Sequence, residues 1–179
     1  PKESIDKIVY LTQGKLYPDF IGIELGLAEK LAIKAISEVS GKSEEEVEKK
    51  FSEIGDLGKV AETFLEKKTQ LTLFQRPLTI DVVYDAFEKM AKASGEGAMD
   101  LKVRYLCSLL NDATPKEARY IIRTALGRLR LGVADMTILD ALAIAYGGGK
   151  ASRELLERAY NLSSDLGLVA KAVAFEGLE

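Results

Sequence analysis

Histidine and tryptophan are absent from this chain of 179 residues, and cysteine occurs once. Without histidine, Ser-His-Asp triads and Cys-His pairs are excluded, as are metal sites built on imidazole. A single cysteine also excludes a disulfide framework. Cys107 lies in the apolar pattern VRYLCSLL and is predicted to be a small buried hydrophobe rather than a nucleophile or a ligand.

Long apolar runs are also missing, so the sequence offers no segment that would span a bilayer, and its start has no signal-peptide pattern. We therefore expect a cytoplasmic protein that makes no contact with a membrane. Gly147–Lys150 resembles part of a phosphate-binding loop, but Ile144 stands where that motif needs its first glycine, and Ala151 stands where it needs serine or threonine. No catalytic constellation is found, so the chain is not expected to perform chemistry alone.

The residues that are present have ordinary globular composition, with 47% apolar and 30% charged residues. Glutamate and lysine are frequent, which favours a thermophilic source. The apolar spacing predicts an all-α protein, a compact multi-helix domain of roughly nine helices covering residues 1–179 with no sheet. The one strand-like alternation, Thr69–Phe74, is broken by Arg76-Pro77 and is expected to be an extended connection. No repeat of fixed period is found, so a solenoid is not expected.

Helix boundaries follow from capping signals and glycines. Two capping boxes are predicted, one from Ser43 to Glu46 and one from Thr114 to Glu117. In the first half of the chain we expect a short helix ending at Gly14, a long one marked by Leu25, Ala28 and the apolar residues up to Val39, and three more that start at Ser43, after Gly58 and at Thr79, the last of them ending at about Ala93. In the second half we expect helices over residues 98–110, from Thr114, over 134–146, from Ser152 to about Asn161, and over 164–175.

The stretch Thr114–Gly132 is strongly amphipathic. At 100° per residue its apolar residues share one face, and its cations lie beside a glycine on another face. Residues 115–132 carry a net charge of +4 in a chain of net charge −3, so the remainder carries −7. The apolar face consists of Ala118, Ile121, Ile122, Ala125 and Leu129, and the opposite face, which we call the basic stripe, consists of Lys116, Arg119, Arg123, Gly127 and Arg130.

Two interpretations of the basic stripe remain. A solvated basic face on a core helix is the ordinary one. The other is a contact surface for nucleic acid, which is favoured by the six residues from Gly127 to Gly132, where two glycines and the arginines Arg128 and Arg130 crowd together. The glycine turn that holds Gly55, Gly58 and Lys59 has a similar ambiguity. Its backbone N–H groups could bind phosphate, or it could be a plain turn between helices.

Several stretches of the sequence resemble the N-terminal DNA-binding domain of ATP-dependent DNA ligases, most closely the archaeal ones. The matches keep a consistent order and extend over nearly the whole chain. They are Gln13–Phe20, Glu24–Lys30, Gly55–Gly58, Val60–Glu62, Ser94–Gly97, Tyr120–Arg123, Gly127–Gly132, Ile138–Leu142 and Arg158–Gly167.

The resemblance implies an all-helical domain that holds nicked duplex DNA from the minor-groove side, without reading sequence, for nick sealing in replication, recombination and repair. Adenylation and OB-fold domains, ATP and Mg²⁺ would belong to a longer parent, a monomer that could also meet a sliding clamp. The resemblance places Gly127, Arg128, Arg130 and Gly132 against the DNA backbone and adds Lys102 as a further contact. Arg119, Arg123, Gly55, Gly58 and Lys59 complete the expected DNA-binding residues.

The sequence departs from the family pattern at three points. Gly97-Ala98-Met99-Asp100 stands where Gly-Ser-Gln-Asp is common, so side-chain contacts to DNA at positions 98 and 99 are not expected. The Lys-x-Asp-Gly motif with the nucleophilic lysine is absent, so the chain alone should be inactive. The family also usually begins a few helices earlier, which indicates a fragment. The alternative function is a helical protein-interaction scaffold with a basic docking face.

Overall fold

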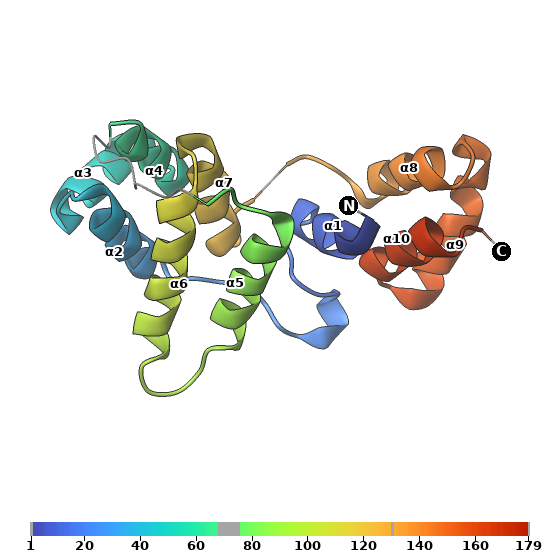
Figure 1. The fold of residues 1–179 in the computed structure, drawn as a ribbon, viewed down its shortest axis with the longest axis horizontal. Helices are drawn as coiled ribbons and strands as arrows, with labels where there is room; N and C mark the ends of the chain where they lie inside the picture. Colours follow the sequence, from blue (N-terminus) through green and yellow to red (C-terminus); the bar gives the residue numbers. More distant parts are fainter. Residues whose placement is uncertain (1, 68–75, 130, 179) are drawn as a thin grey trace. The chain divides into compact units, whose positions relative to one another are not determined.

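A computed structural model describes residues 2–67, 76–129 and 131–178 of the chain. Within these residues it contains ten α-helices and three short 3-10 helices and no strand, which confirms the predicted all-α class (Figure 1). Thr69–Phe74, expected to be an extended connection, lies outside the described residues. In chain order the elements are η1 (Lys2–Ser4), α1 (Ile5–Thr12), η2 (Asp19–Ile21), α2 (Glu29–Ser40), α3 (Glu44–Ile54), α4 (Leu57–Glu66), α5 (Ile80–Lys92), α6 (Ala98–Asp112), α7 (Pro115–Ala125), α8 (Asp135–Tyr146), η3 (Lys150–Ser152), α9 (Arg153–Ser163) and α10 (Leu166–Phe175).

The chain divides into two compact units. The central unit is continuous in sequence and covers residues 24–129, whereas the terminal unit combines residues 2–23 with residues 131–178. The expectation of one domain over residues 1–179 stays a prediction. Each unit has its own buried apolar residues, so each is described by itself.

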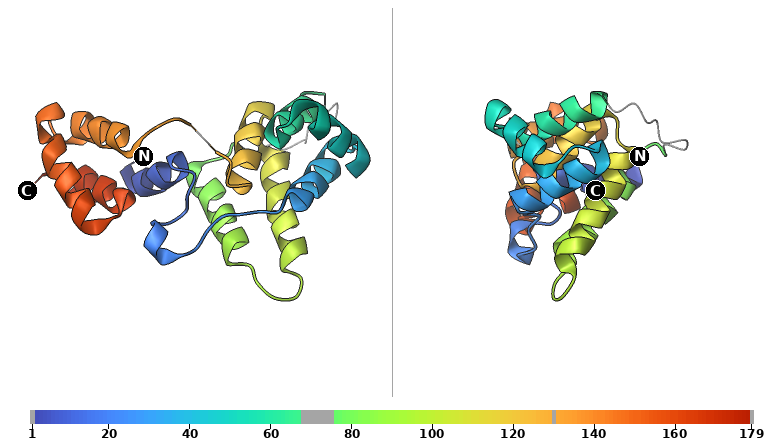
Figure 2. Two further views of the ribbon diagram at one scale, coloured as in Figure 1. Left: turned by 180° about the vertical axis from the view of Figure 1, so that it is seen from behind. Right: turned by 90° about the vertical axis from the view of Figure 1, so that its left-hand side faces the viewer.

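The central unit is built around two helix pairs. α4 packs along α7, and α2 packs along α6. α5 and α6 form an antiparallel hairpin, which can be followed in the left view of Figure 2. Apolar side chains from each of these helices are buried almost completely, and because burial of this kind is the main stabilising term in folding, they form the core of the unit. The largest are Ile36, Leu57, Phe87, Met90, Leu106, Leu110 and Ile122.

The segment before α2 is extended rather than helical, which corrects the expected start of that helix at Leu25 and Ala28. Leu25 and Leu27 are buried while Gly26 between them is exposed, the alternation of an extended chain. The backbone N–H of Leu27 donates to the carbonyl oxygen of Ala125 at 2.8 Å. This long-range hydrogen bond thus holds the segment against the end of α7, and the segment does not form a first turn of α2.

The terminal unit packs α1 against α10 and joins α8, α9 and α10. Its core contains Val9, Leu139, Leu156, Leu166 and Val169. Two polar contacts fix α1 in place, because the hydroxyl of Tyr10 donates to Asp165 at 2.7 Å and Nε2 of Gln13 donates to Asp135 at 2.8 Å. Tyr160 of α9 also donates to Asp135, and that hydrogen bond, together with burial, raises the pKa of Tyr160 to about 12.

The same helix–turn–helix arrangement occurs once in each unit, as α3–α4 and as α9–α10, and corresponding residues of the two copies lie 109 positions apart in the sequence. Asp56-Leu57-Gly58 at the start of α4 matches Asp165-Leu166-Gly167 at the start of α10, and Ser43 before α3 matches Ser152 before α9. In each copy the leucine and glycine are buried, and the residue before the aspartate has a positive φ, +74° at Gly55 and +54° at Ser164. The spacing is far longer than the periods of solenoid repeats, so a search for short periods does not find it.

Both copies use the glycine for a close helix contact. A Cβ added at Gly58 would lie 2.6 Å from the backbone oxygen of Arg119 on α7. A Cβ added at Gly167 would lie 2.3 Å from the ring of Tyr10 on α1. The aspartate caps the helix in both copies, accepting from the N–H groups of Gly58 and Lys59 in α4 and from that of Leu168 in α10. In each copy the glycine therefore lets a third helix pack closely against the second helix of the pair: α7 packs against α4, and α1 packs against α10.

Most of the predicted helix starts are confirmed. Both capping boxes are present, at Ser43 with Glu46 and at Thr114 with Glu117, and Thr79 caps α5. The prediction for Ser152 is wrong in its detail, because its hydroxyl donates to the carbonyl oxygen of Gly149 at 2.7 Å and caps no N–H group of α9. The glycine turn before it winds into η3, which turns the hydroxyl away from the helix start.

Candidate nucleic-acid interface

α7 carries only the first part of the basic stripe, Lys116, Arg119 and Arg123, on a helix whose opposite face is buried. Ala118, Ile121, Ile122 and Ala125 are at most 5% exposed, as the apolar spacing predicts. The helix stops sooner than that spacing requires, since Ala125 is its last residue and Gly127 takes a φ of +66°. Leu129, predicted to continue the apolar face, therefore lies beyond the helix and is only half-buried.

Arg123 is held by an ion pair with Asp56. Nε of Arg123 donates to Oδ2 of Asp56 at 3.1 Å, and a second guanidinium nitrogen reaches the same oxygen. The side chains of both residues are 24% exposed. Because Asp56 also caps α4, this one carboxylate connects the start of α4 to the last turn of α7.

The pKa of Asp56 lies below its ordinary value. Burial acts to raise this pKa, but the hydrogen bond from Arg123 and those from the N–H groups of Lys59 and Gly58, together with the charge of Arg123, outweigh burial. A carboxyl group whose pKa is lowered by folding stabilises the folded state above its unfolded pKa, and this contribution is lost as the pH falls through the folded pKa.

We expect the Asp56→Asn variant to be less stable than wild type by about 1–2 kcal/mol at pH 7, because asparagine keeps the cap but loses the charged pair. This difference in the free energy of unfolding should shrink as the pH falls below about 4, the ordinary pKa of aspartate. Urea denaturation at pH 7, 4 and 3 measures it. Asp100→Asn is the control, since Asp100 is 72% exposed in its pair with Lys34; a pH-independent penalty at Asp56 would contradict the assignment.

The other two described arginines of this region are paired as well. Arg119 reaches Glu62 of α4 at 3.2 Å, and its Nε is buried without a hydrogen-bond partner in the described part of the chain. Arg128 reaches Glu29, the first residue of α2, at 2.6 Å. The positive charge that the sequence concentrates in residues 115–132 is therefore partly balanced by carboxylates from α4 and α2.

The predicted glycine turn is shorter than expected, because α4 already begins at Leu57 and includes Gly58 and Lys59 in its first turn. These residues lie against the face of α7 that carries Arg119 and Arg123. Gly55 ends α3 and is exposed, Gly58 is buried against the backbone of α7, and Lys59 is exposed beside it. The N–H groups of Gly58 and Lys59 donate to Asp56, so a phosphate at this helix start would have to share them with a carboxylate.

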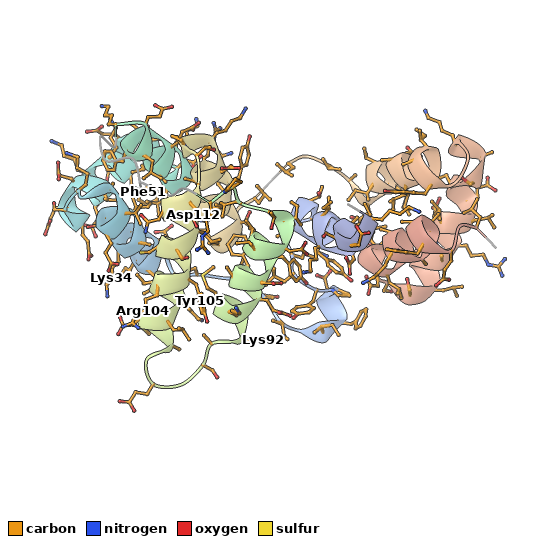
Figure 3. The ribbon with its side chains drawn as sticks, in the orientation of Figure 1. Lys34, Phe51, Lys92, Arg104, Tyr105 and Asp112 are labelled. Atoms are coloured by element: carbon orange, nitrogen blue, oxygen red, sulfur yellow. The ribbon has the colours of Figure 1, made fainter. Side chains whose placement is uncertain are left out.

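The remaining predicted residues are placed apart from this face or outside the description. A Cβ added at Gly127 would lie 3.4 Å from the carbonyl oxygen of Leu25, which joins the end of α7 to the extended segment. Gly132 belongs to the terminal unit, with a φ of +69° and open space around it. Lys102 is half-buried on α6, the helix that carries the labelled Arg104 and Tyr105 in Figure 3. Arg130 lies outside the described residues.

The structure thus brings Arg119, Arg123, Gly55, Gly58 and Lys59 together where α4 and α7 meet. The acidic partners of the arginines were not predicted from the sequence. Asp56 had a local signal, since an aspartate before a helix start is a typical cap. Glu29 and Glu62 had none, because each lies far along the chain from the arginine that it contacts.

Metal binding and thiol chemistry are not indicated in the described ranges. They contain no group of three or more histidine, cysteine, aspartate or glutamate side chains placed to hold a metal ion. Cys107 is half-buried rather than buried as expected, and burial together with the hydrogen bond to Glu38 raises the pKa of its thiol to about 12, so the thiolate is suppressed. No helix among these residues is long and apolar enough to cross a membrane.

Comparison with known proteins identifies the family. The family model described as DNA ligase N terminus matches residues 1–143. This chain belongs to the DNA ligase family. It is 53% identical over 178 residues to the DNA ligase of Nitrosopumilus maritimus and 54% identical over 186 residues to DNA ligase 2 of Thermofilum pendens, matches that cover 99% and 100% of the chain.

The same matches cover 30% and 31% of those two ligases. The DNA ligase of Cenarchaeum symbiosum gives the same proportion, with 51% identity over all of this chain and 30% of the relative. The chain therefore spans less than a third of the length of the ligases that it matches, and the family membership agrees with the resemblance found in the sequence.

Proposed function

We propose that this chain is the DNA-binding part of an archaeal, ATP-dependent DNA ligase. It would hold nicked duplex DNA through the phosphate backbone and the minor groove while domains of a longer parent seal the nick in replication, recombination and repair. ATP and Mg²⁺ would serve the parent, and no residue of this chain is assigned to them. The parent would be a monomeric, cytoplasmic enzyme at the nucleoid, with a sliding clamp as a further partner.

The observation that carries the proposal is the row of arginines beside glycines, on a chain of the ligase family. A guanidinium has five N–H donors in a planar fork, so an arginine that is paired with one carboxylate can still donate to a phosphate oxygen. Arg128 is 57% exposed in its pair with Glu29, which leaves room for such a contact. Contacts of this kind position a duplex without reading its sequence, as nick sealing requires.

The ion pairs also explain why carboxylates stand beside the arginines of a DNA-binding surface. Asp56 and Glu62 hold Arg123 and Arg119 in fixed orientations before DNA arrives, so less side-chain entropy is lost on binding. The same carboxylates oppose an approaching phosphate, which limits affinity for nucleic acid in general. We infer a surface tuned for moderate, reversible binding, as suits an enzyme that must leave each sealed nick.

Fluorescence anisotropy of labelled DNA tests the proposal on the chain as it stands. We expect nicked and intact duplex to bind more tightly than single strands of the same length, with affinity falling steeply as salt rises from about 50 to 200 mM because bound counterions are released. Absence of duplex binding, or preference for single strands, would overturn the proposal and leave the protein-interaction scaffold as the better interpretation of the basic stripe.

A further inference from the structure

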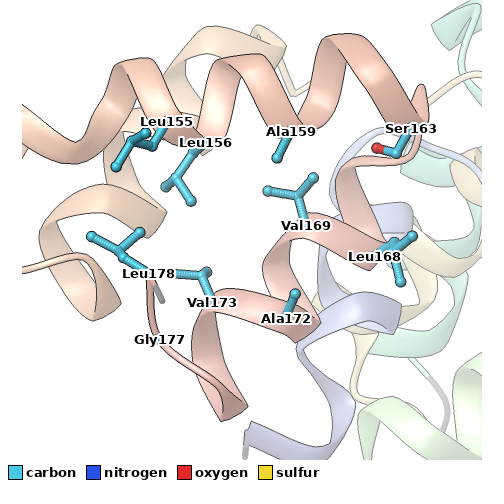
Figure 4. Close-up of a pocket in the computed structure, with 10 residues that line it drawn as sticks. All are labelled: Leu155, Leu156, Ala159, Ser163, Leu168, Val169, Ala172, Val173, Gly177 and Leu178. Carbon is cyan, nitrogen blue, oxygen red and sulfur yellow. The ribbon is translucent and has the colours of Figure 1, made fainter.

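The terminal unit carries an apolar groove that is unrelated to the basic stripe. It lies between α9 and α10 and encloses about 370 Å³. In Figure 4 the side chains of Leu156 and Val169 point into the space between the two helices. Its rim is apolar and exposed, since Leu155 is 56% exposed, Leu168 is 54% exposed and Leu178 is 39% exposed.

The other copy of the helix–turn–helix, α3–α4, shows that a helix pair of this kind does not need an apolar rim. α3 and α4 of the central unit place buried apolar residues at the corresponding positions, Val47 for Leu156 and Val60 for Val169. Their rim residues, however, are polar. Leu155 of α9 corresponds to Glu46, Ala159 to Lys50, Leu168 to Lys59 and Ala172 to Thr63.

The two copies of the motif therefore differ on one face, which is apolar in α9–α10 and polar in α3–α4. Exposed leucines cost solubility and favour association, so a soluble protein rarely gathers them without a partner. Leu155 and Leu168 stand on exposed positions where the other copy forms its helix pair with the charged residues Glu46 and Lys59. The apolar rim is consequently a property of the terminal unit that calls for a covering surface.

We propose that this groove is the docking site for the ligase polypeptide that follows residue 179 in the parent, which covers Leu155, Leu168 and Leu178 with an apolar segment. The proposal rests on the proposed function, because it needs a parent ligase. Two observations favour this occupant over a separate protein. Gly177 and Leu178 themselves line the groove, so the chain passes its edge at the last described residues. About 70% of the length of the matched ligases lies outside this region, and the matched family model describes the N terminus.

Hydrogen exchange of backbone amides, followed by mass spectrometry, tests the proposal by comparing this chain with the full-length parent. We expect the amides of α9 and α10 to exchange about tenfold more slowly in the parent, because docking suppresses local opening of the two helices. Amides of α3 and α4 should exchange alike in both proteins. Equal exchange of α9 and α10 in the two proteins would overturn the proposal.

The variant Leu155→Glu/Leu168→Lys gives the groove the residues of the other copy. Since Glu46 and Lys59 occupy the same positions in α3 and α4, this variant should fold, which its thermal unfolding checks. In the parent it should return the exchange of α9 and α10 to the rate of the isolated chain. Leu162→Glu is the matched control, because Leu162 is 81% exposed on α9 and does not line the groove; it should leave the slowed exchange intact.

Two other outcomes separate the alternatives. If the isolated chain forms dimers in sedimentation that the double variant abolishes, the groove joins two copies and the proposal is wrong. Duplex binding by the isolated chain should be the same for wild type and the double variant, since neither substitution touches the basic stripe. Failure of the proposed function would show there as absent DNA binding, whereas failure of the docking proposal would leave DNA binding in place.

Discussion

Replacing Gly58 by valine is expected to lower the free energy of unfolding by about 3 kcal/mol, the upper end of the cost of overpacking a well-filled contact. The clash cannot be relieved by a side-chain rotation alone. A Cβ at this position would lie 2.6 Å from the backbone oxygen of Arg119 and 3.0 Å from Cγ of Arg123, so α4 and α7 would have to separate. That separation would also pull Asp56 away from Arg123.

Thermal unfolding measures the effect, with an expected fall in the melting temperature of about 10 °C. Gly26→Val is the matched control. Gly26 has open space around its added Cβ and lies in an extended segment, where valine is favourable, so its melting temperature should change little. A Gly58→Val variant that melts like wild type would contradict the close approach of α4 and α7.

The Arg128→Ala/Arg130→Ala variant is expected to bind duplex DNA about a hundredfold more weakly than wild type near 0.1 M salt, since removing one arginine from a phosphate costs about tenfold there. The slope of log affinity against log salt should become shallower by about 0.9 for each phosphate that the variant no longer neutralises. Both quantities come from anisotropy titrations across a salt series. The slope is the more informative, because a merely misfolded variant would not change it in this graded way.

Glu29→Gln is the control for this experiment, because it breaks the ion pair of Arg128 and keeps the arginine. If the arginine contacts phosphate, the glutamine variant should bind at least as tightly as wild type, because one opposing charge is gone. Should Glu29→Gln weaken binding as much as the double arginine variant, the pair would be structural and the phosphate contact would be refuted.

Local signals in the sequence were sufficient for most of the helix starts, but not for the long-range contacts that shift the others. The capping boxes at Ser43 and Thr114 each involve residues three apart, so the sequence alone predicts them correctly. Leu25 and Ala28 fit the helical spacing of α2, yet a backbone hydrogen bond from Leu27 to Ala125 keeps this segment extended. No pattern within a helix window indicates a partner so far along the chain.

In the candidate site, too, local features were predictable from the sequence and long-range contacts were not. The sequence identified α7 as a helix with one apolar and one basic face, but it could not show that Asp56, Glu62 and Glu29 are drawn to the arginines. Net charge counted along the chain therefore overstates the positive potential of this surface. The likeness between α3–α4 and α9–α10 was not predicted from the sequence, although both Asp-Leu-Gly stretches are present in it, and its meaning depends on which faces are buried.

The order of the two units along the chain has a consequence for synthesis on the ribosome. Residues 24–129 form a unit that is continuous in sequence, so this unit can fold as soon as α7 and the residues after it have emerged. α1 is made before all of it but packs on α10, and Tyr10 meets Asp165 across 155 residues. Val9 of α1 therefore stays uncovered until α10 has been made, and because closing so long a loop is slow, we expect the terminal unit to form more slowly than the central unit.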